Sequence, residues 1–249
     1  MTQNHPQWQR IIPEPLVSSD QVHVWRIFLD VNVHEIESLL GHLSADEVSR
    51  ASRFRFEKDK IRFIAAHGIL RRILGHYLQQ YPQKIRFAYA PNGKPILADG
   101  LNATTLSFNL SHSGGFALCA ITLHRKVGVD IEFIRHDVAV EQIARRFFSQ
   151  SEVRSLESMQ KHELYETFYR YWTRKEAFLK ATGDGLSLPM EKIDVSAISG
   201  KTLSPATLLR NEKENVRWYV QDLFPGEGYT GAIAVEAACC RLTYLQYSL

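Results

Sequence analysis

The stretch GVDIE, residues 128–132, carries two carboxylates where the flanking residues predict a β-strand. Side chains two residues apart on a strand point to the same face, so Asp130 and Glu132 stand side by side, opposite Val129 and Ile131. Like charges held this close repel one another, unless a cation lies between them or water solvates both. Because a short D-x-E pattern often matches by chance, on its own it favours an exposed strand end, with a metal site as the alternative.

A third carboxylate, Glu176, lies in the middle of the apolar face of an expected long helix. At about 100° per residue, this face comprises Tyr165, Phe168, Tyr169, Trp172 and Leu179. An unpaired charge among such residues is costly, so Glu176 is expected either to pair with an arginine or to bind a metal. Lys180, one turn further on, is either the partner of Glu176 or a donor to an anionic ligand.

Together, Asp130, Glu132 and Glu176 make a set of oxygen donors without His or Cys. Such a set suits Mg²⁺, which often bridges protein carboxylates to the phosphates of a substrate. The first half of the chain holds residues suited to binding phosphate, namely Arg62, Lys94 in PNGKP, and Ser111 and His112 in NLSHSGG. Each is unremarkable alone, and their number is what predicts a phosphate-bearing substrate.

The composition is that of an ordinary globular protein, with 45% hydrophobic and 23% charged residues. The net charge of +3 is too small to indicate nucleic-acid binding, and no apolar run is long enough to span a membrane. The three cysteines, Cys119, Cys239 and Cys240, form neither a disulfide framework nor a C-x-x-C metal motif. With no secretory signal at the start, we expect a soluble, cytoplasmic protein.

The elements expected to position these residues follow one order twice, and the fold class they predict is α/β. In the first half we expect a strand at 22–29, helices at 33–43, from Ser44 and at 56–78, and strands at 85–89, 106–110 and 116–123. In the second half we expect a strand at 127–134, helices at 138–148, 149–160 and 162–181, and strands at 193–196, 216–223 and 230–237. The halves are then 1–125 and 126–249, with GVDIE at their junction, and clefts between domains are favoured ligand sites.

Five short motifs occur in an order and spacing typical of one enzyme family. They are GKP at 93–95, FNLSHS at 108–113, GVDIE at 128–132, RRFFSQSE at 145–152 and WTRKEAFLKATGDGLSLP at 172–189. Five matches over about a hundred residues are very specific. The chain resembles the 4′-phosphopantetheinyl transferases of the larger, Sfp-like type. The basic segment 50–62 is similar to the family's N-terminal half, so the resemblance covers nearly the whole chain.

The resemblance implies a pseudo-dimer of two similar α/β halves, with coenzyme A bound in the cleft between them. It implies that Mg²⁺, or Mn²⁺ in its place, is held against the pyrophosphate by Asp130, Glu132 and Glu176. The implied coenzyme A contacts are Ser111, His112, Lys175 and Lys180 at phosphates, Gly93, Lys94 and Pro95 at the adenine end, and Arg62 and Arg50 at the 3′-phosphate. At the position of Arg50 the family more usually shows lysine.

The implied reaction joins phosphopantetheine to a serine of an acyl or peptidyl carrier protein and releases 3′,5′-ADP. Glu152 is the implied base for the serine hydroxyl, directly or through a water, and Lys180 the implied donor to the leaving phosphate. Without the resemblance, Glu152 is better interpreted as a carboxylate at a helix N-terminus. The enzyme is expected to act as a monomer, with neither nucleic acid nor membrane as a partner.

Two other functions use the same residues. A Mg²⁺-dependent phosphohydrolase needs the carboxylates but no acceptor protein, and a non-catalytic module that binds coenzyme A or carrier proteins needs neither Glu152 nor Lys180. The sequence leaves open whether the carriers belong to fatty acid, polyketide or nonribosomal peptide synthases.

Overall fold

The computed structural model describes residues 7–11, 17–98, 105–198, 200, 202–205, 207–208, 217–236 and 240–248. Its contacts divide the chain into two units, and each unit has its own hydrophobic core. The first unit combines Met1–Tyr89, Pro95–His124 and Arg241–Leu249, and the second combines Ala90–Lys94 with Arg125–Cys240. Each contains a sheet and a 22-residue helix, so the expected mixed α/β class is confirmed.

The sheet of the first unit has the strand order β1-β13-β2-β6-β5 among the described residues. Its strands are β1 (Gln9–Ile11), β2 (Gln21–Phe28), β5 (Leu106–Ser113), β6 (Phe116–Leu123) and β13 (Arg241–Tyr247). The strands β2, β6 and β5 run antiparallel, whereas β13 pairs parallel to β2 and β1 parallel to β13. A separate hairpin pairs β3 (Phe87–Tyr89) with β4 (Pro95–Leu97).

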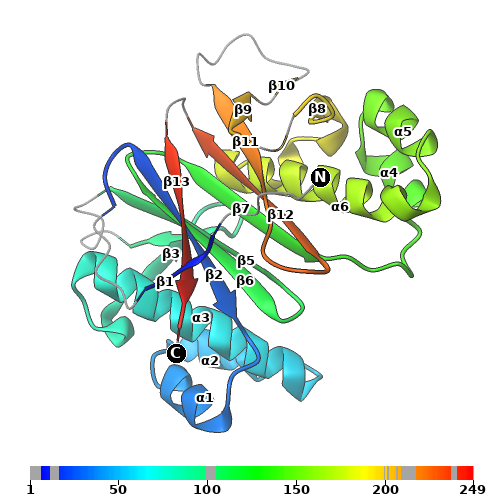
Figure 1. Ribbon diagram of the computed structural model, residues 1–249. Coiled ribbons are helices and arrows are strands. Elements are labelled where there is room, and N and C mark those ends of the chain that lie inside the picture. The colour runs from blue at the N-terminus through cyan, green and yellow to red at the C-terminus, as the bar shows by residue number, and fades with distance from the viewer. Residues whose placement is uncertain are drawn as a thin grey trace. The chain divides into compact units, whose positions relative to one another are not determined.

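Three helices, α1 (Val33–Leu40), α2 (Ala45–Ala51) and α3 (Glu57–Leu78), accompany this sheet, and the short 3₁₀ turn Pro82–Lys84 follows α3 (Figure 1). The helix α2 starts with the expected capping box, because Ser44 and Glu47 each accept a backbone N–H from the other. Buried residues of α3 form the core with residues of β2, β5 and β6, among them Ile69, Ile73, Trp25, Phe108 and Ile121.

His23 is a buried histidine on β2 whose protonation should control the stability of the first unit. Its Nδ1 lies 2.6 Å from the hydroxyl of Tyr77, which also accepts a hydrogen bond from Trp25 Nε1 at 3.0 Å. Burial lowers the pKa of His23 from its ordinary 6.5 to about 4. Between these values the unfolded chain binds more protons than the folded one, so stability is lost as the pH falls through this window.

We therefore expect the wild type to lose about 2 kcal/mol of unfolding free energy between pH 7 and pH 5 through His23. Urea unfolding of wild type and His23→Gln at both pH values measures this contribution. The unfolding free energy that the variant loses between pH 7 and pH 5 should be smaller than the wild-type loss by this contribution. Equal losses in both proteins would show that His23 does not cause the effect.

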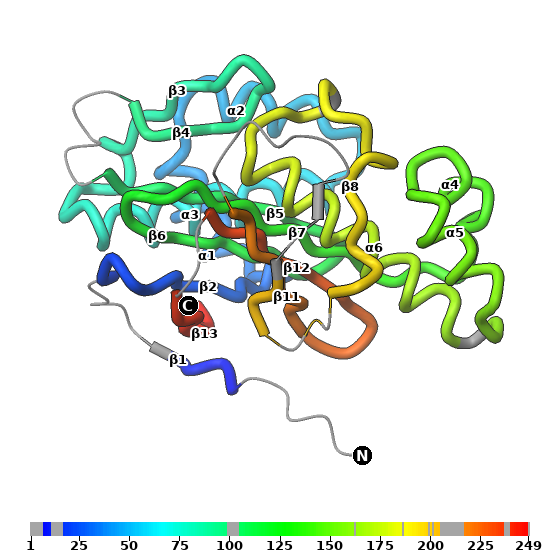
Figure 2. Tube along the Cα trace, turned by 90° about the horizontal axis from the view of Figure 1, so that it is seen from above, coloured from blue at the N-terminus to red at the C-terminus, as the bar shows by residue number. Residues whose placement is uncertain are grey.

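The sheet of the second unit has the strand order β7-β12-β11-β9, and all described neighbours in it are antiparallel. Its strands are β7 (Val127–Phe133), β9 (Ser204–Pro205), β11 (Trp218–Leu223) and β12 (Tyr229–Glu236). The remaining elements are the helices α4 (Val140–Phe147), α5 (Gln150–Glu157) and α6 (Lys161–Thr182), the 3₁₀ turns Gly185–Ser187 and Met190–Lys192, and the paired strands β8 (Ile193–Asp194) and β10 (Thr207–Leu208). The long helix α6 packs on β7 and β12 (Figures 1 and 2).

Two details differ from the expected division at 125/126. The last strand, β13, belongs to the first unit, because it pairs with β2 through six residues from Arg241 to Gln246. The turn Ala90–Lys94 belongs by its contacts to the second unit, although it joins β3 to β4. Of the remaining expectations, Val216, Ala237 and Cys239 lie outside the described residues.

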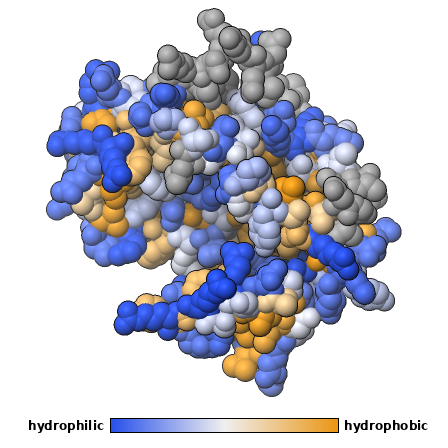
Figure 3. Space-filling model, turned by 180° about the vertical axis from the view of Figure 1, so that it is seen from behind, coloured by the Kyte–Doolittle hydropathy of each residue, from blue (hydrophilic) through white to orange (hydrophobic). Residues whose placement is uncertain are grey.

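Exposed large hydrophobic side chains are scattered over both units and include Val33, Phe56, Tyr81 and Phe133. On the face seen in Figure 3, hydrophobic residues form separate patches between hydrophilic ones, as is usual for a protein surface. Among the described helices, none combines the length and apolar character needed to cross a membrane.

Candidate active site

The strand β7 and the helix α6 approach each other closely at Gly128, the first residue of GVDIE. A Cβ atom at this position would lie 2.1 Å from the carbonyl oxygen of Ala177 and 2.4 Å from the backbone nitrogen of Ala181. Both are backbone atoms of α6 and have little freedom to move, so only glycine fits here. This approach brings Asp130, two residues further along β7, to the helix that carries Glu176 and Lys180.

Asp130 and Lys180 form an ion pair at this contact. The ammonium of Lys180 donates to Asp130 Oδ1 at 2.5 Å, and the side chain of Lys180 is 30% exposed whereas that of Asp130 is 4% exposed. Lys180 thus pairs with a carboxylate of β7, whereas the sequence left open a pairing with Glu176. The exposed part of Lys180 leaves its ammonium within reach of a ligand.

Glu176 lies close enough to Asp130 for the two carboxylates to repel each other. Burial and the negative charge of Asp130 raise the pKa of Glu176, and the positive charge of Lys180 offsets part of this effect. Two carboxylates held against their repulsion are the kind of donor pair that a bound cation relieves.

Glu132 is not part of this cluster. It is half-buried on β7 opposite Thr230. Burial raises the pKa of Tyr169, and the negative charge of Glu132 adds to this increase. Within the described ranges, no three His, Cys, Asp or Glu side chains come together as a metal-binding group. The structure therefore brings two of the three expected ligands together. Their oxygen donors fit Mg²⁺, and the role of Glu132 as the third ligand stays a prediction.

Lys94 holds the turn of PNGKP to the same region. Its ammonium donates to the carbonyl oxygens of Val127, at the start of β7, and Lys180, in the last turn of α6, at 2.9 and 2.6 Å. Burial, with the charges of Lys126 and Lys180, lowers the pKa of Lys94 to about 8. Lys94 thus joins the two backbones that carry Asp130 and Glu176. Its expected contact with adenine stays a prediction, as do those of Gly93 and Pro95.

The expected phosphate contacts Arg62, Ser111 and His112 all lie in the first unit. The guanidinium of Arg62 makes a bidentate pair with Asp30 at 2.8 and 3.0 Å, which holds the pKa of Asp30 below its usual range. On β5, Ser111 is buried and His112 is exposed, as expected for neighbours that point to opposite faces. Arg50 stacks its guanidinium over the ring of Phe63, 5.4 Å from the centroid.

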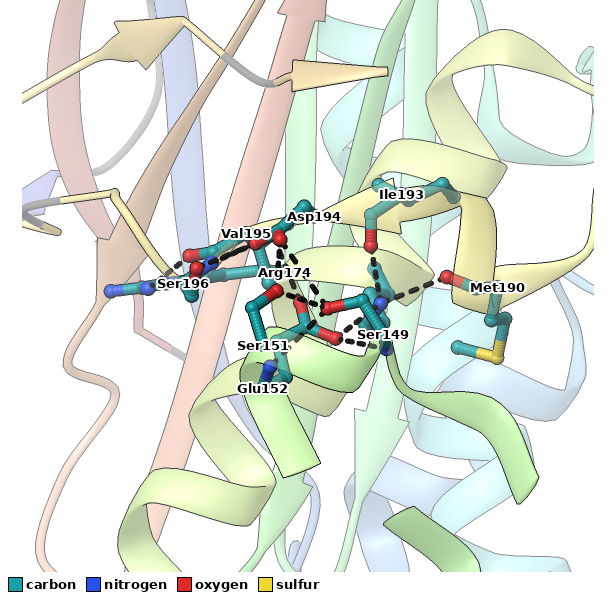
Figure 4. A network of polar contacts seen from close by, with 10 residues as sticks. Ser149, Ser151, Glu152, Arg174, Met190, Ile193, Asp194, Val195 and Ser196 are labelled. Carbon is teal, nitrogen blue, oxygen red and sulfur yellow. Dashed lines mark hydrogen bonds and ion pairs between the residues drawn. The ribbon is translucent and has the colours of Figure 1, made fainter. Parts of the chain in front are cut away.

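Glu152 and Lys175 occupy a different and fully buried place. Their side chains have 0% exposure, and Lys175 Nζ lies 2.7 Å from Glu152 Oε2. Figure 4 shows Glu152 and the polar residues around it. Glu152 accepts the backbone N–H of Ser149 as part of a capping box at the start of α5, which agrees with its interpretation as a helix N-terminal carboxylate. The sequence showed this cap as an S-x-x-E pattern, but it gave no sign that Lys175 would pair with Glu152.

Comparisons with known proteins agree with these motifs. Two family models match, 4′-phosphopantetheinyl transferase superfamily over residues 126–234 and 4′-phosphopantetheinyl transferase, N-terminal over residues 30–124. The 4′-phosphopantetheinyl transferase HetI of Nostoc sp. is 40% identical over 228 residues, which cover 92% of this chain and 93% of that protein. This chain therefore belongs to the 4′-phosphopantetheinyl transferase superfamily.

Other relatives are more distant. The 4′-phosphopantetheinyl transferase Sfp of Bacillus subtilis is 32% identical over 174 residues, covering 69% of this chain and 75% of that protein. Among solved structures, the holo-[acyl-carrier-protein] synthase of Thermotoga maritima matches 47% of this chain and 64% of its own, with 21% identity and a TM-score of 0.34.

Proposed function

We propose that this protein transfers 4′-phosphopantetheine from coenzyme A to a serine of an apo acyl or peptidyl carrier protein, leaving holo carrier protein and 3′,5′-ADP. The observation that carries this proposal is the cluster of Asp130, Glu176 and Lys180 where β7 meets α6, since these residues occupy the family motifs. A cytoplasmic location and action as a monomer are part of the proposal.

Asp130 and Glu176, joined by Glu132, would hold Mg²⁺ or Mn²⁺ at this cluster. When bound there, the cation would neutralise charge on the pyrophosphate and orient its phosphates for transfer. The serine oxygen forms a bond to the β-phosphorus of coenzyme A, the bond to 3′,5′-ADP breaks, and the serine proton leaves to a base. Lys180, whose ammonium pairs with Asp130 and whose side chain is 30% exposed, would donate a hydrogen bond to the departing phosphate, where negative charge grows in the transition state.

The base that accepts the serine proton is assigned from the family resemblance. Glu152 is the family's implied base, but its carboxylate is fully buried and accepts hydrogen bonds from two backbone N–H groups. Base catalysis by Glu152 requires these contacts and the pair with Lys175 to open. Lys175 likewise needs to leave its partners before it can reach a phosphate.

Incubation with coenzyme A, Mg²⁺ and an apo carrier protein tests the proposed reaction. We expect the carrier to gain the mass of one phosphopantetheine group and 3′,5′-ADP to form in equal amount. A carrier whose acceptor serine is replaced by alanine is the control. Free phosphopantetheine without a mass gain of the carrier would instead indicate a phosphohydrolase. The absence of any reaction would indicate a binding module.

Arg62 is proposed to contact the 3′-phosphate of coenzyme A, and its pairing with Asp30 makes this testable with two variants. Arg62→Ala should weaken the binding of coenzyme A about tenfold or more, since charge-assisted contacts to phosphate are worth about 1.5–3 kcal/mol. Binding of 3′-dephospho-coenzyme A should hardly change, because it lacks the group that Arg62 contacts. Calorimetric titration of both ligands measures the difference.

Asp30→Asn is the matched control for this prediction. Asp30 competes with phosphate for the guanidinium of Arg62, so its neutralisation should leave coenzyme A binding equal or tighter. Equal weakening of both ligands by Arg62→Ala would show that Arg62 has only a structural role.

A further inference from the structure

The buried ion pair of Glu152 and Lys175 joins three segments of the second unit. Glu152 comes from the first turn of α5 and Lys175 from the middle of α6, and both contact the segment 190–195 that follows α6. Lys175 Nζ donates to the carbonyl oxygens of Met190, at 2.8 Å, and of Ile193, while Glu152 Oε1 accepts the N–H of Val195 at 2.9 Å. Figure 4 shows Glu152 of α5 beside Met190, Ile193 and Val195 of this segment, with the contacts as dashed lines.

Both groups make their hydrogen bonds within the protein. A lysine ammonium has three protons, and Lys175 has three acceptors in Glu152, Met190 and Ile193. Both oxygens of Glu152 accept backbone N–H groups, from Ser149 and Val195. With no exposed surface on either side chain, the pair suits a structural task better than contact with a substrate.

Neighbouring polar contacts fix the same segment. Asp194 accepts hydrogen bonds from the hydroxyls of Ser149 and Ser151 and from the backbone and hydroxyl of Ser196. Arg174, beside Lys175 on α6, donates to the carbonyl oxygen of Val195. The segment that receives Lys175 is therefore itself held in place.

The position of Lys175 gives the pair its consequence. Lys175 directly precedes Glu176, and consecutive side chains on a helix are about 100° apart. Whatever fixes the direction of Lys175 also fixes the rotation of α6 about its axis, and so the direction of Glu176 toward Asp130. Gly128 meets α6 at the backbone of Ala177 and Ala181, and the buried pair adds a second anchor at Lys175.

We propose that Glu152 and Lys175 are positioning residues: their buried pair fixes the rotation of α6 and thereby holds Glu176 toward Asp130 in the cluster proposed to bind Mg²⁺. This inference rests on the proposed function. It differs from the roles that the family resemblance implied, a base for Glu152 and a phosphate contact for Lys175.

The two sets of roles predict opposite results for a double variant. Removing one partner of a buried ion pair leaves an uncompensated charge, whereas replacing both partners together is often tolerated. A positioning pair should thus recover function when the second charge is also removed. If Glu152 is the base, replacing it by Gln removes the base and cannot restore activity. Under the implied roles the double variant is therefore no more active than Lys175→Met.

The experiment compares the full-length wild type with Lys175→Met, Glu152→Gln and the double variant. We expect Lys175→Met to lower the melting temperature by on the order of 10 °C. Turnover and the affinity for Mn²⁺, measured separately, should each fall about 10–100-fold, as for residues that orient metal ligands. The double variant should regain at least about tenfold of the turnover lost, and most of the melting temperature, since both losses come from the unpaired charge.

The exposed pair Arg145–Glu157, whose side chains are 68% and 48% exposed, is the control for the stability cycle. Arg145→Met and Glu157→Gln should have small, additive effects on the melting temperature. The proposal would be overturned if the losses of melting temperature in Lys175→Met and Glu152→Gln were additive in the double variant. It would also be overturned if the double variant were no more active than Lys175→Met. If neither single variant folds, a folded double variant supports it and an unfolded one overturns it.

Failure of the proposed function can be told apart from failure of this inference. A wild type that transfers nothing to any carrier contradicts the function, while the melting temperatures and Mn²⁺ affinities still test the pair. A transferase whose stability and Mn²⁺ affinity do not respond to Lys175→Met contradicts only the inference.

Discussion

Asp130→Asn or Glu176→Gln is expected to lower the turnover of phosphopantetheine transfer by about 10³-fold or more. A bound cation contributes several kcal/mol of transition-state stabilisation, and each change removes one of its charged ligands. A loss of about 1.4 kcal/mol lowers the rate tenfold. Either variant should still fold, because the carboxylates repel each other and the loss of one charge relieves the other. Initial rates with saturating carrier protein and coenzyme A measure the effect.

Glu163→Gln is the matched control, since Glu163 is an exposed carboxylate on the same helix. It should leave turnover unchanged. Full activity of Asp130→Asn, or of the wild type in excess EDTA, would contradict a metal role for this cluster.

Gly128→Ala is expected to have the second large effect, a loss of both stability and transfer. The added methyl group would overlap backbone atoms of α6 at 2.1 and 2.4 Å, so β7 and α6 must move apart. Overpacking in a core usually costs about 1–3 kcal/mol, and overlap with helix backbone, which cannot change rotamer as a side chain can, places this change at or above the upper end. The separation also moves Asp130 away from Glu176 and Lys180. Thermal unfolding and transfer assays on the same preparation measure both losses.

Gly41→Ala is the control for this variant. Gly41 follows α1 with a φ of −64°, and a Cβ there would lie 3.4 Å from its nearest neighbour, the carbonyl oxygen of Ser38. Its melting temperature should stay close to that of the wild type. A Gly128→Ala protein with wild-type stability and activity would show that the close approach of β7 and α6 is not required.

The helices were the most predictable part of the fold because their signals are local. The capping box at Ser44 and the apolar spacing of α3 and α6 each lie within one segment of the sequence, and the structure places these helices within a few residues of the expected ranges. The strand β13 was not predicted, because its partner β2 lies about two hundred residues earlier and nothing in the local sequence specifies a parallel pairing. For the same reason its membership of the first unit could be found only from the structure.

The site was predictable where side-chain periodicity decides it. The two-residue period of β7 pointed to Asp130 and Glu132, and the 3.6-residue period of α6 pointed to Glu176. The structure brings Asp130 and Glu176 together with Lys180, and the metal role of Glu132 stays a prediction. The backbone partners of Lys94 and Lys175 were not predictable, because every residue has a carbonyl oxygen. A side chain that binds a backbone carbonyl oxygen requires no particular residue type at the partner position, so the sequence does not reveal the contact.

Whether Asp130 and Glu176 hold a divalent cation is measured most directly by titrating Mn²⁺ into the protein with coenzyme A and following free Mn²⁺ by electron paramagnetic resonance. We predict one saturable site in the wild type that Mg²⁺ displaces, and affinities at least about tenfold weaker in Asp130→Asn and Glu176→Gln. Binding of Mn²⁺ with wild-type affinity by both variants would contradict the assignment of these carboxylates as metal ligands.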